Sequence, residues 1–174
     1  MSGSPLTLMF SDDGSVPNNP ALPVLLYRGA IDVAATHDPE SEVERVFMAN
    51  GWGRDLWRDG IYPYTHYHSM IHEALGIARG ATRVRLGGTQ GRDFELNAGD
   101  VAVLPAGTGH QRLASSADLR VIGGYPPEGT YNLCRGAKTE HDEALRTIPL
   151  VPVPANDPVH GDAGPLLSLW RQTA

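Results

Sequence analysis

Three histidines and one glutamate, in two separate segments of the chain, are the residues whose types and spacing could do chemistry. His66 and His68 are separated by one residue, and because side chains alternate along a strand, both imidazoles would leave the same face. Glu73 follows five residues after His68, and His110 comes behind a Pro-Gly turn. If these side chains converge, three imidazoles and a carboxylate form a mixed nitrogen and oxygen site for a divalent first-row metal.

This donor set predicts one divalent metal ion (Fe, Mn, Zn or Ni) bound by His66, His68, Glu73 and His110. Each histidine would bind as the neutral imidazole and the glutamate as the carboxylate. Four protein ligands leave two positions open on an octahedral ion, but they close a tetrahedral one. Iron and manganese suit the open site, and zinc, nickel and copper stay as alternatives because the order of affinities does not set metal selectivity in cells.

His72 competes with Glu73 for the fourth ligand position, because the two residues are adjacent. Neighbours on a strand point to opposite faces, so only one of them can face the metal. We predict that Glu73 is the ligand and that His72 faces away. The reverse arrangement, with His72 on the metal and Glu73 outside, is the alternative.

The same alternation suggests which polar side chains lie nearest the metal. Tyr62 and Tyr64 share the face of His66, and Arg112 shares the face of His110. We predict catalytic roles for Tyr64 and Arg112, with the guanidinium holding a substrate carboxylate in a two-pronged pair. The alternative is that the tyrosines are packed aromatics and that Arg112 reaches solvent at the mouth of the barrel.

The elements that must position these residues are short strands separated by turn signals. Many short strands of even spacing favour a double-sheet barrel, so we expect an all-β, jelly-roll fold with one or two short flanking helices. A barrel of about eight strands has an interior just wide enough for one small ligand. The strands expected in the core are Tyr62–His68, Glu73–Ala78, Thr82–Leu86, Asp93–Leu96, Val101–Leu104, His110–Leu113 and Leu119–Gly123.

The flanks of this core carry helix signals. Asp38 can cap a helix that begins with Pro39, and Asn50-Gly51 can end it. We treat the chain as a single domain with a barrel core at about 52–125, an extension before it at 1–51 and a tail after it at 126–174. The further elements expected are strands at Leu6–Phe10 and Leu22–Tyr27, a short helix at Lys138–Thr147 and an extended proline-rich tail at Leu150–Trp170.

Two segments of the sequence resemble the two motifs of the cupin family. Every position and gap of the first cupin motif is present, and the second motif is complete except for its closing Asn, which is Ala114 here. That Asn is not a metal ligand in the family, so the departure bears on the pocket more than on the metal. Beyond these motifs, GTYNLCRG and DPVHGDAGPL resemble the YjlB-like bacterial cupins. The matching residues are Gly60, His66, His68, Glu73 and Gly80 in the first motif, and Gly99, Pro105, Gly107 and His110 in the second.

Composition narrows the class of partner. The chain has 174 residues, a formal charge of −6 and no block of Lys or Arg, which argues against nucleic acid and against an anionic membrane surface. No apolar run is long enough to span a bilayer, and the single cysteine, Cys134, suits a reducing compartment. We therefore expect a cytoplasmic protein that binds a small molecule. The family resemblance adds the expectation of a homodimer.

Two kinds of function fit these observations. The cupin resemblance implies dioxygenase or isomerase chemistry, and we favour a dioxygenase-like oxidoreductase that uses the metal on a small metabolite. The alternative is a non-catalytic small-ligand-binding cupin, such as a sensor, because one fold hosts many functions.

Overall fold

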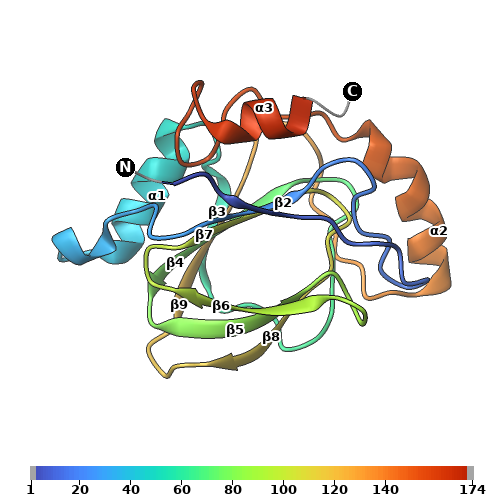
Figure 1. Cartoon of the computed structure of the whole chain (residues 1–174), viewed down its shortest axis with the longest axis horizontal. Helices are drawn as coiled ribbons and strands as arrows, with labels where there is room; N and C mark the ends of the chain where they lie inside the picture. Colours follow the sequence, from blue (N-terminus) through green and yellow to red (C-terminus); the bar gives the residue numbers. More distant parts are fainter. Residues whose placement is uncertain (1–2, 172–174) are drawn as a thin grey trace.

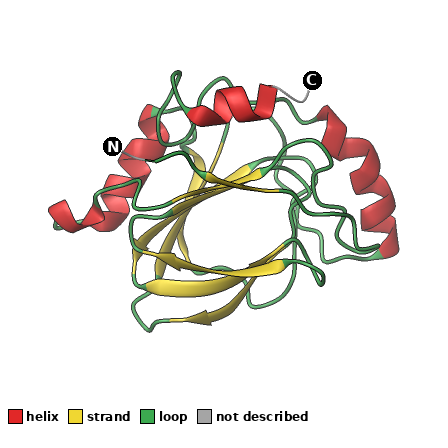
Figure 2. Ribbon diagram, viewed as in Figure 1, coloured by secondary structure: helices red, strands yellow, loops and turns green. Residues whose placement is uncertain are grey.

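Two antiparallel sheets face each other in the computed structural model, which describes residues 3–171, and the helices lie outside them (Figures 1 and 2). This is the predicted mostly-β, double-stranded β-helix architecture with few helices. The six-stranded sheet has the order β1 (Leu6–Leu8), β2 (Val24–Tyr27), β7 (Val101–Leu104), β4 (Glu73–Arg79), β9 (Arg120–Tyr125) and β3 (Arg54–Asp59). The three-stranded sheet has the order β6 (Arg92–Asn97), β5 (Ala81–Leu86) and β8 (His110–Ser115).

Alternation along β4 divides the molecule into an inner and an outer core. Leu75 and Ile77 point between the two sheets, whereas Ala74 and Ala78 point outward to the helices. Burying a leucine or isoleucine side chain stabilises the fold by about 1.5–3 kcal/mol, so both faces of this central strand stabilise it. Glu73 has the parity of Leu75 and therefore faces the space between the sheets.

Helix α1 (Pro39–Ala49) packs closely on the outer face of β4. Its cap is the predicted one, since the Asp38 carboxylate accepts hydrogen bonds from the Ser41 amide at 3.1 Å and from the Ser41 hydroxyl at 2.7 Å. Val43 rests directly on Gly76, where an added Cβ would lie 2.4 Å from Val43 Cγ1. Glycine at this position therefore sets the distance between helix and sheet. The helices are η1 (Val33–Ala35), α1 (Pro39–Ala49), α2 (Lys138–Thr147), η2 (Ile148–Leu150) and α3 (Pro165–Arg171).

Three sequence-based expectations about elements were wrong. The segment Tyr62–His68 is an irregular loop with two isolated bridges, because Pro63 cannot donate to a ladder. Strand β3 was missed, since its sequence, RDLWRD, has charged residues on both faces. The tail was expected to be extended, but it contains α3, which Pro165 begins in the first helical position. The other expected strands and both expected helices are confirmed to within a few residues.

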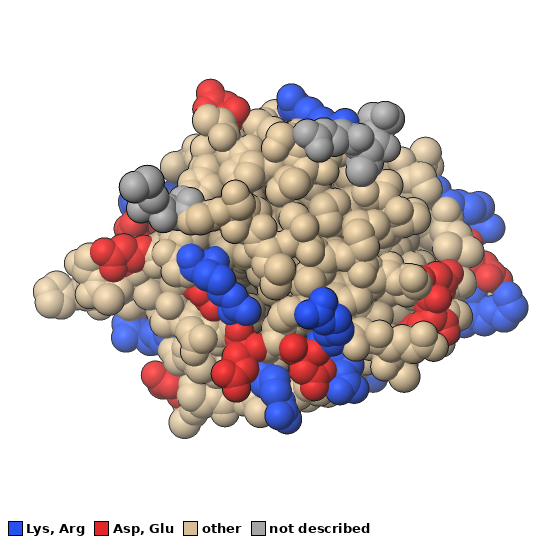
Figure 3. All heavy atoms as spheres, viewed as in Figure 1, with Lys and Arg blue, Asp and Glu red and all other residues tan. Residues whose placement is uncertain are grey.

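Charges of both signs are mixed on the face shown in Figure 3, where Lys and Arg lie beside Asp and Glu. Arg85 of β5 pairs with Asp93 of β6 at 2.7 Å, and Arg28 pairs with Asp100 at 2.8 Å. This face therefore has no basic patch of the kind that binds phosphates. Among residues 3–171, no helix combines the length and apolar character needed to cross a membrane.

Candidate metal centre

Backbone hydrogen bonds pin the loop between β3 and β4 onto the start of β8. The amide of His66 donates to the carbonyl of His110 at 3.1 Å, and the reverse bond measures 2.9 Å. The amide of Gly107 donates to the carbonyl of His68 at 2.7 Å. This bridge brings the two predicted segments together and places the rings of His66 and His110 with centroids 4.0 Å apart.

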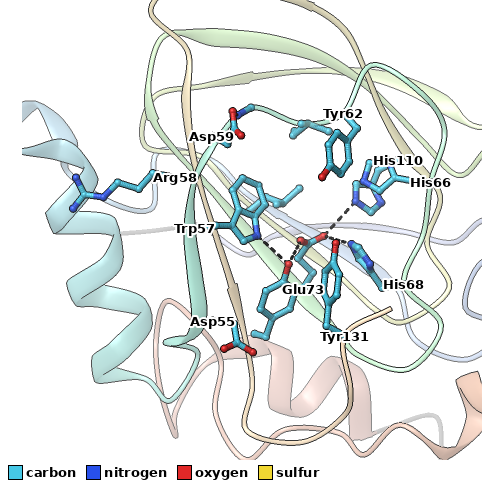
Figure 4. Close-up of a pocket in the computed structure, with 14 residues that line it drawn as sticks. Asp55, Trp57, Arg58, Asp59, Tyr62, His66, His68, Glu73, His110 and Tyr131 are labelled. Atoms are coloured by element: carbon cyan, nitrogen blue, oxygen red, sulfur yellow. Dashed lines mark hydrogen bonds and ion pairs between the residues drawn. The ribbon is translucent and has the colours of Figure 1, made fainter. Parts of the chain in front are cut away.

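The three imidazoles converge between the sheets, and Glu73 lies beside two of them (Figure 4). One ring nitrogen from each histidine lies within 4.8 Å of the others, and all three residues are buried. Glu73 is only 2% exposed, and its Oε2 lies 3.3 Å from His68 Nε2 and 3.2 Å from His110 Nε2. The structure thus brings together all four residues that the spacing singled out.

Backbone carbonyls fix the orientation of every ring. The Nδ1 of His66 lies 3.0 Å from the carbonyl of Tyr64, and the Nδ1 of His110 lies 2.9 Å from that of Thr108. In the same way, His68 Nδ1 hydrogen-bonds the carbonyl of Asn132. With Nδ1 donating, each Nε2 turns a lone pair toward the centre, as metal-binding histidines do.

The pKa shifts of His66 and Glu73 suit a cation, whereas burial lowers the pKa of His68 but the Glu73 carboxylate outweighs it and raises that pKa above its usual value. Burial and the neighbouring His110 lower the pKa of His66 to about 3, so that its imidazole is neutral near pH 7. Burial raises the pKa of Glu73, but attraction to His68 and His110 outweighs it and lowers the pKa below its usual value, an effect that requires a proton on the facing nitrogens. Yet Glu73 Oε2 is buried without a hydrogen-bond partner in the described part of the chain. A buried carboxylate oxygen facing nitrogen lone pairs is costly unless a cation lies between them, so these donors fit a divalent metal.

His72 lies on the opposite side of the sheet. Its Nδ1 accepts a hydrogen bond from the amide of Ala106 at 2.9 Å, and its Nε2 lies 3.1 Å from the carbonyl of Pro152. Its ring packs on Trp170 with centroids 4.8 Å apart, and burial lowers its pKa to about 4. Both ring nitrogens are engaged, which excludes the alternative in which His72 replaces Glu73.

Two aromatic side chains support Glu73 from behind. The hydroxyl of Tyr125 donates to Glu73 Oε1 at 3.0 Å, and Trp57 Nε1 donates to the same hydroxyl at 2.9 Å. The indole lies flat on Gly123, where an added Cβ would be 1.9 Å from Trp57 Cε2. Sequence reasoning assigned neither aromatic to the site, because the signal is cross-strand pairing and not a motif.

A second support comes from the segment GTYNLCRG. Besides its carbonyl bond to His68, Asn132 accepts from the Ser69 amide at 3.0 Å and donates to the Ser69 hydroxyl at 2.8 Å. Tyr67 and Cys134 form an isolated bridge that ties the same two segments together. The resemblance in GTYNLCRG was the available signal for these residues, and it gave them no role.

A cavity of about 440 Å³ lies in front of the four converging side chains. Its volume is in the range of small-molecule sites. Indole and phenol rings form much of its wall, and Tyr125 and Tyr131 meet edge to face with centroids 5.7 Å apart. The aromatic residues of the wall are Trp57, Tyr62, Tyr125 and Tyr131.

Tyr64 and Arg112, for which catalytic roles were predicted, are not among the residues that line this cavity. Tyr64 stacks on Tyr62 with centroids 4.9 Å apart, and the guanidinium of Arg135 lies 3.6 Å from its ring. Arg112 pairs with Val84 on the inner face, as the parity count required, but its guanidinium donates to the carbonyl of Ile61 at 3.0 Å and to Ser115 Oγ at 3.1 Å. These contacts hold both side chains outside the cavity lining. No observation tests their catalytic roles, which stay predictions.

Comparison with known proteins gives one extensive relative. No family model matches the chain. The "Uncharacterized protein YjlB" of Bacillus subtilis (strain 168) is 37% identical over 164 residues, which are 94% of this chain and 95% of that protein.

Solved structures resemble the chain only distantly. A double-stranded beta-helix protein of Klebsiella pneumoniae is 13% identical over 78% of this chain and 82% of its own, with a TM-score of 0.38. Acireductone dioxygenase from Bacillus anthracis, with a cadmium ion in its active centre, is 18% identical over 61% and 80%, also with a TM-score of 0.38. The 11S globulin of Wrightia tinctoria is 15% identical with a TM-score of 0.37, and the matching 45% of this chain spans 21% of it. Scores at this level carry no argument about activity.

Identity to YjlB over nearly the whole of both chains goes together with both cupin motifs and two facing antiparallel sheets. The chain therefore belongs to the same family as YjlB, a family of cupins with the double-stranded β-helix fold.

Proposed function

We propose that this protein binds one divalent metal ion through His66, His68, His110 and Glu73 and acts on a small organic molecule as a dioxygenase-like metalloenzyme. The observation that carries the metal assignment is the buried Oε2 of Glu73, which has no hydrogen-bond partner among the described residues and faces two imidazole nitrogens at 3.2 and 3.3 Å. One cation between these side chains would supply the positive partner that Glu73 Oε2 lacks and would bind the lone pairs of the three imidazoles.

The cavity supports catalysis over a purely structural ion. Four protein ligands would leave two positions on an octahedral ion, and the four side chains line a cavity of about 440 Å³ that could admit a substrate. When bound there, iron or manganese supplies Lewis-acid or oxygen-activating chemistry. The protein's own part is to hold Glu73 through Tyr125 and to orient the substrate against Trp57 and Tyr131, whose rings also exclude water.

The test begins with metal analysis of protein purified without chelators, in wild type and in the His66→Ala variant. We expect about one equivalent of metal per chain in the wild type and a loss of most of it in the variant. The exposed His37 offers a matched control, because His37→Ala removes an imidazole far from the cavity lining.

Open coordination positions can be probed without knowing the substrate. Protein loaded anaerobically with Fe(II) should give the electron paramagnetic resonance signal of an iron–nitrosyl adduct on exposure to nitric oxide. Tightly bound tetrahedral zinc with no nitrosyl signal after iron loading would instead favour a structural ion and a non-catalytic binding protein. Oxygen uptake with a panel of small substrates then separates the dioxygenase from the isomerase, which converts its substrate without consuming oxygen.

A further inference from the structure

Two carboxylates of β3 lie at the mouth of the cavity, and the arginine that lines the cavity beside them points elsewhere. Asp55 and Asp59 both line the cavity and are exposed at its rim. Arg58 lies between them in the sequence, but its guanidinium turns away to Glu44 on α1, with bonds of 2.6 and 2.8 Å (Figure 4). The one cation among the lining residues is therefore already neutralised outside the cavity.

The other arginines near the mouth are engaged as well. Arg54 donates to the carbonyls of Pro127 and Gly129 at 2.8 and 2.9 Å, and so ties β3 to the loop that carries Tyr131. Its Nε also lies 3.5 Å from Asp55 Oδ2, a long ion pair between exposed side chains that offsets the charge of Asp55 only weakly. Arg112 bonds a carbonyl and a hydroxyl, as described above. Neither arginine is among the residues that line the cavity, so the substrate-binding role predicted from the sequence for Arg112 has no support from the lining.

A break in the strand pairing places the two aspartates. Arg54 pairs with Tyr125 and Trp57 pairs with Gly123, so β3 has one residue more than β9 between these pairs. Within this bulge Asp55 has a φ of +48°, a left-handed conformation that is uncommon for residues other than glycine. Bulges beside active sites commonly re-aim a side chain, and this one leaves Asp55 at the rim and puts Asp59 on the inner face.

Exposed phenol rings complete the mouth. Tyr62 is 47% exposed and Tyr131 is 46% exposed, although both have large rings that pack against the histidines of the centre. Tyr62 approaches His66 edge on with centroids 5.2 Å apart, and Tyr131 lies 5.0 Å from His68. Faces of aromatic rings attract organic cations, and nearby carboxylates strengthen that attraction.

We propose that the substrate is a small organic amine in its cationic form, with an apolar or aromatic body that packs on Trp57 and a charged group that rests on the tyrosine faces and is attracted to the rim by the negative charges of Asp55 and Asp59. This inference rests on the proposed function, since it names the substrate class of the same site. It predicts discrimination against carboxylates and phosphate esters, for which the cavity wall offers no free cationic side chain among the described residues.

Three ligands of one shape and different charge test the proposal: phenethylamine, 2-phenylethanol and 3-phenylpropionate. Their affinities are measured by calorimetry with the protein as purified and again after chelation, because a bound metal could itself attract the carboxylate. In the chelated protein we expect the amine to bind at least about fivefold more tightly than the alcohol, and the acid to bind most weakly. The advantage of the amine should shrink at high salt.

Neutral substitutions at the rim give the matched comparison. Asp55→Asn with Asp59→Asn keeps both shapes, and asparagine also tolerates the left-handed backbone of position 55. We expect this double variant to bind the amine and the alcohol equally, with the affinity for the alcohol unchanged. Asp162→Asn, at an exposed position outside the cavity lining, should retain the full preference for the amine.

Equal binding of all three ligands, tightest binding of the acid to the chelated protein, no binding of the amine, or a preference that survives in the double variant would each overturn the assignment. Because the key comparison uses chelated protein, it is separable from the metal hypothesis. If the protein prefers the amine but takes up no metal, the substrate class stands and the proposed metalloenzyme is refuted. If the protein binds metal but shows no preference for the amine, the metal site stands and the substrate class is refuted.

Discussion

Glu73→Gln isolates the charge of the proposed metal ligand while keeping its shape. In the absence of metal, the buried carboxylate is costly because its Oε2 is unpaired beside two imidazoles. A glutamine at this position could keep the hydrogen bond from Tyr125 on its oxygen and turn its amide group toward the two Nε2 atoms. At pH 8 we therefore expect the metal-free variant to be at least as stable as the metal-free wild type.

With metal bound, the wild type should be more stable than the Glu73→Gln variant. A ligand at 100 times its dissociation constant stabilises the folded state by about 2.7 kcal/mol, and 1 kcal/mol corresponds to about 2–4 °C for a domain of this size. The wild type should therefore gain about 5–11 °C in Tm. Loss of groups that merely orient ligands costs metal sites about 10–100-fold in affinity, so loss of a charged ligand should cost at least about 100-fold. The variant would then gain only about 0.4 kcal/mol, or about 1–2 °C, at the same metal concentration.

The assay is thermal unfolding of both proteins, chelated and then supplied with Mn(II), with the exposed Glu143→Gln as the control for loss of a carboxylate elsewhere. The control should respond to metal as the wild type does. A full metal-induced shift in Glu73→Gln would refute the reasoning, because the carboxylate would then contribute nothing to the ion. A chelated variant that unfolds many degrees below the chelated wild type would refute the claim that the carboxylate is unfavourable without a cation.

Three further substitutions test the support of Glu73, the role of His72 and the cap of α1 separately. Tyr125→Phe should weaken metal binding about tenfold in competition with a chromophoric chelator, because Glu73 loses the hydroxyl that orients it, and an unchanged affinity would contradict that role. His72→Leu should lower the free energy of unfolding by about 1–3 kcal/mol in urea, because the buried amide of Ala106 loses its acceptor. Its metal affinity should not change, and a loss of metal would return this residue to the ligand set. Asp38→Ala should cost about 1 kcal/mol in the same titration through loss of the helix cap, with no effect on metal.

The four converging residues and most of the fold could be predicted because their signals are local. The spacing of His66, His68 and Glu73 follows the motif gaps, and strand parity placed Glu73 on the inner face and His72 on the far side. Turn residues and apolar alternation located six of the seven predicted core strands. These features need no knowledge of which strand pairs with which.

The groups around the ligands could not be predicted, because they depend on pairing between distant segments. Tyr125 reaches Glu73 only because β9 lies beside β4, and Asn132 reaches His68 only because the bridge between Tyr67 and Cys134 joins their two segments. The parity count for Arg112 gave the right face, yet the carbonyl of Ile61 draws its guanidinium elsewhere. A face can be read from the sequence, but the contacts that a long side chain makes on that face cannot.

The bulge in β3 shows how much depends on one unpredicted residue. Continuing the register from Arg54 opposite Tyr125 without the bulge would place Leu56, not Trp57, opposite Gly123. Trp57 would then point outward toward α1, and neither the Tyr125 hydroxyl nor the flat surface of Gly123 would have its indole partner. Asp59 would turn outward by the same step and leave the rim without one of its carboxylates. The support of the proposed ligand Glu73 and the proposed preference for amines thus have a common structural origin, a single added residue in an edge strand.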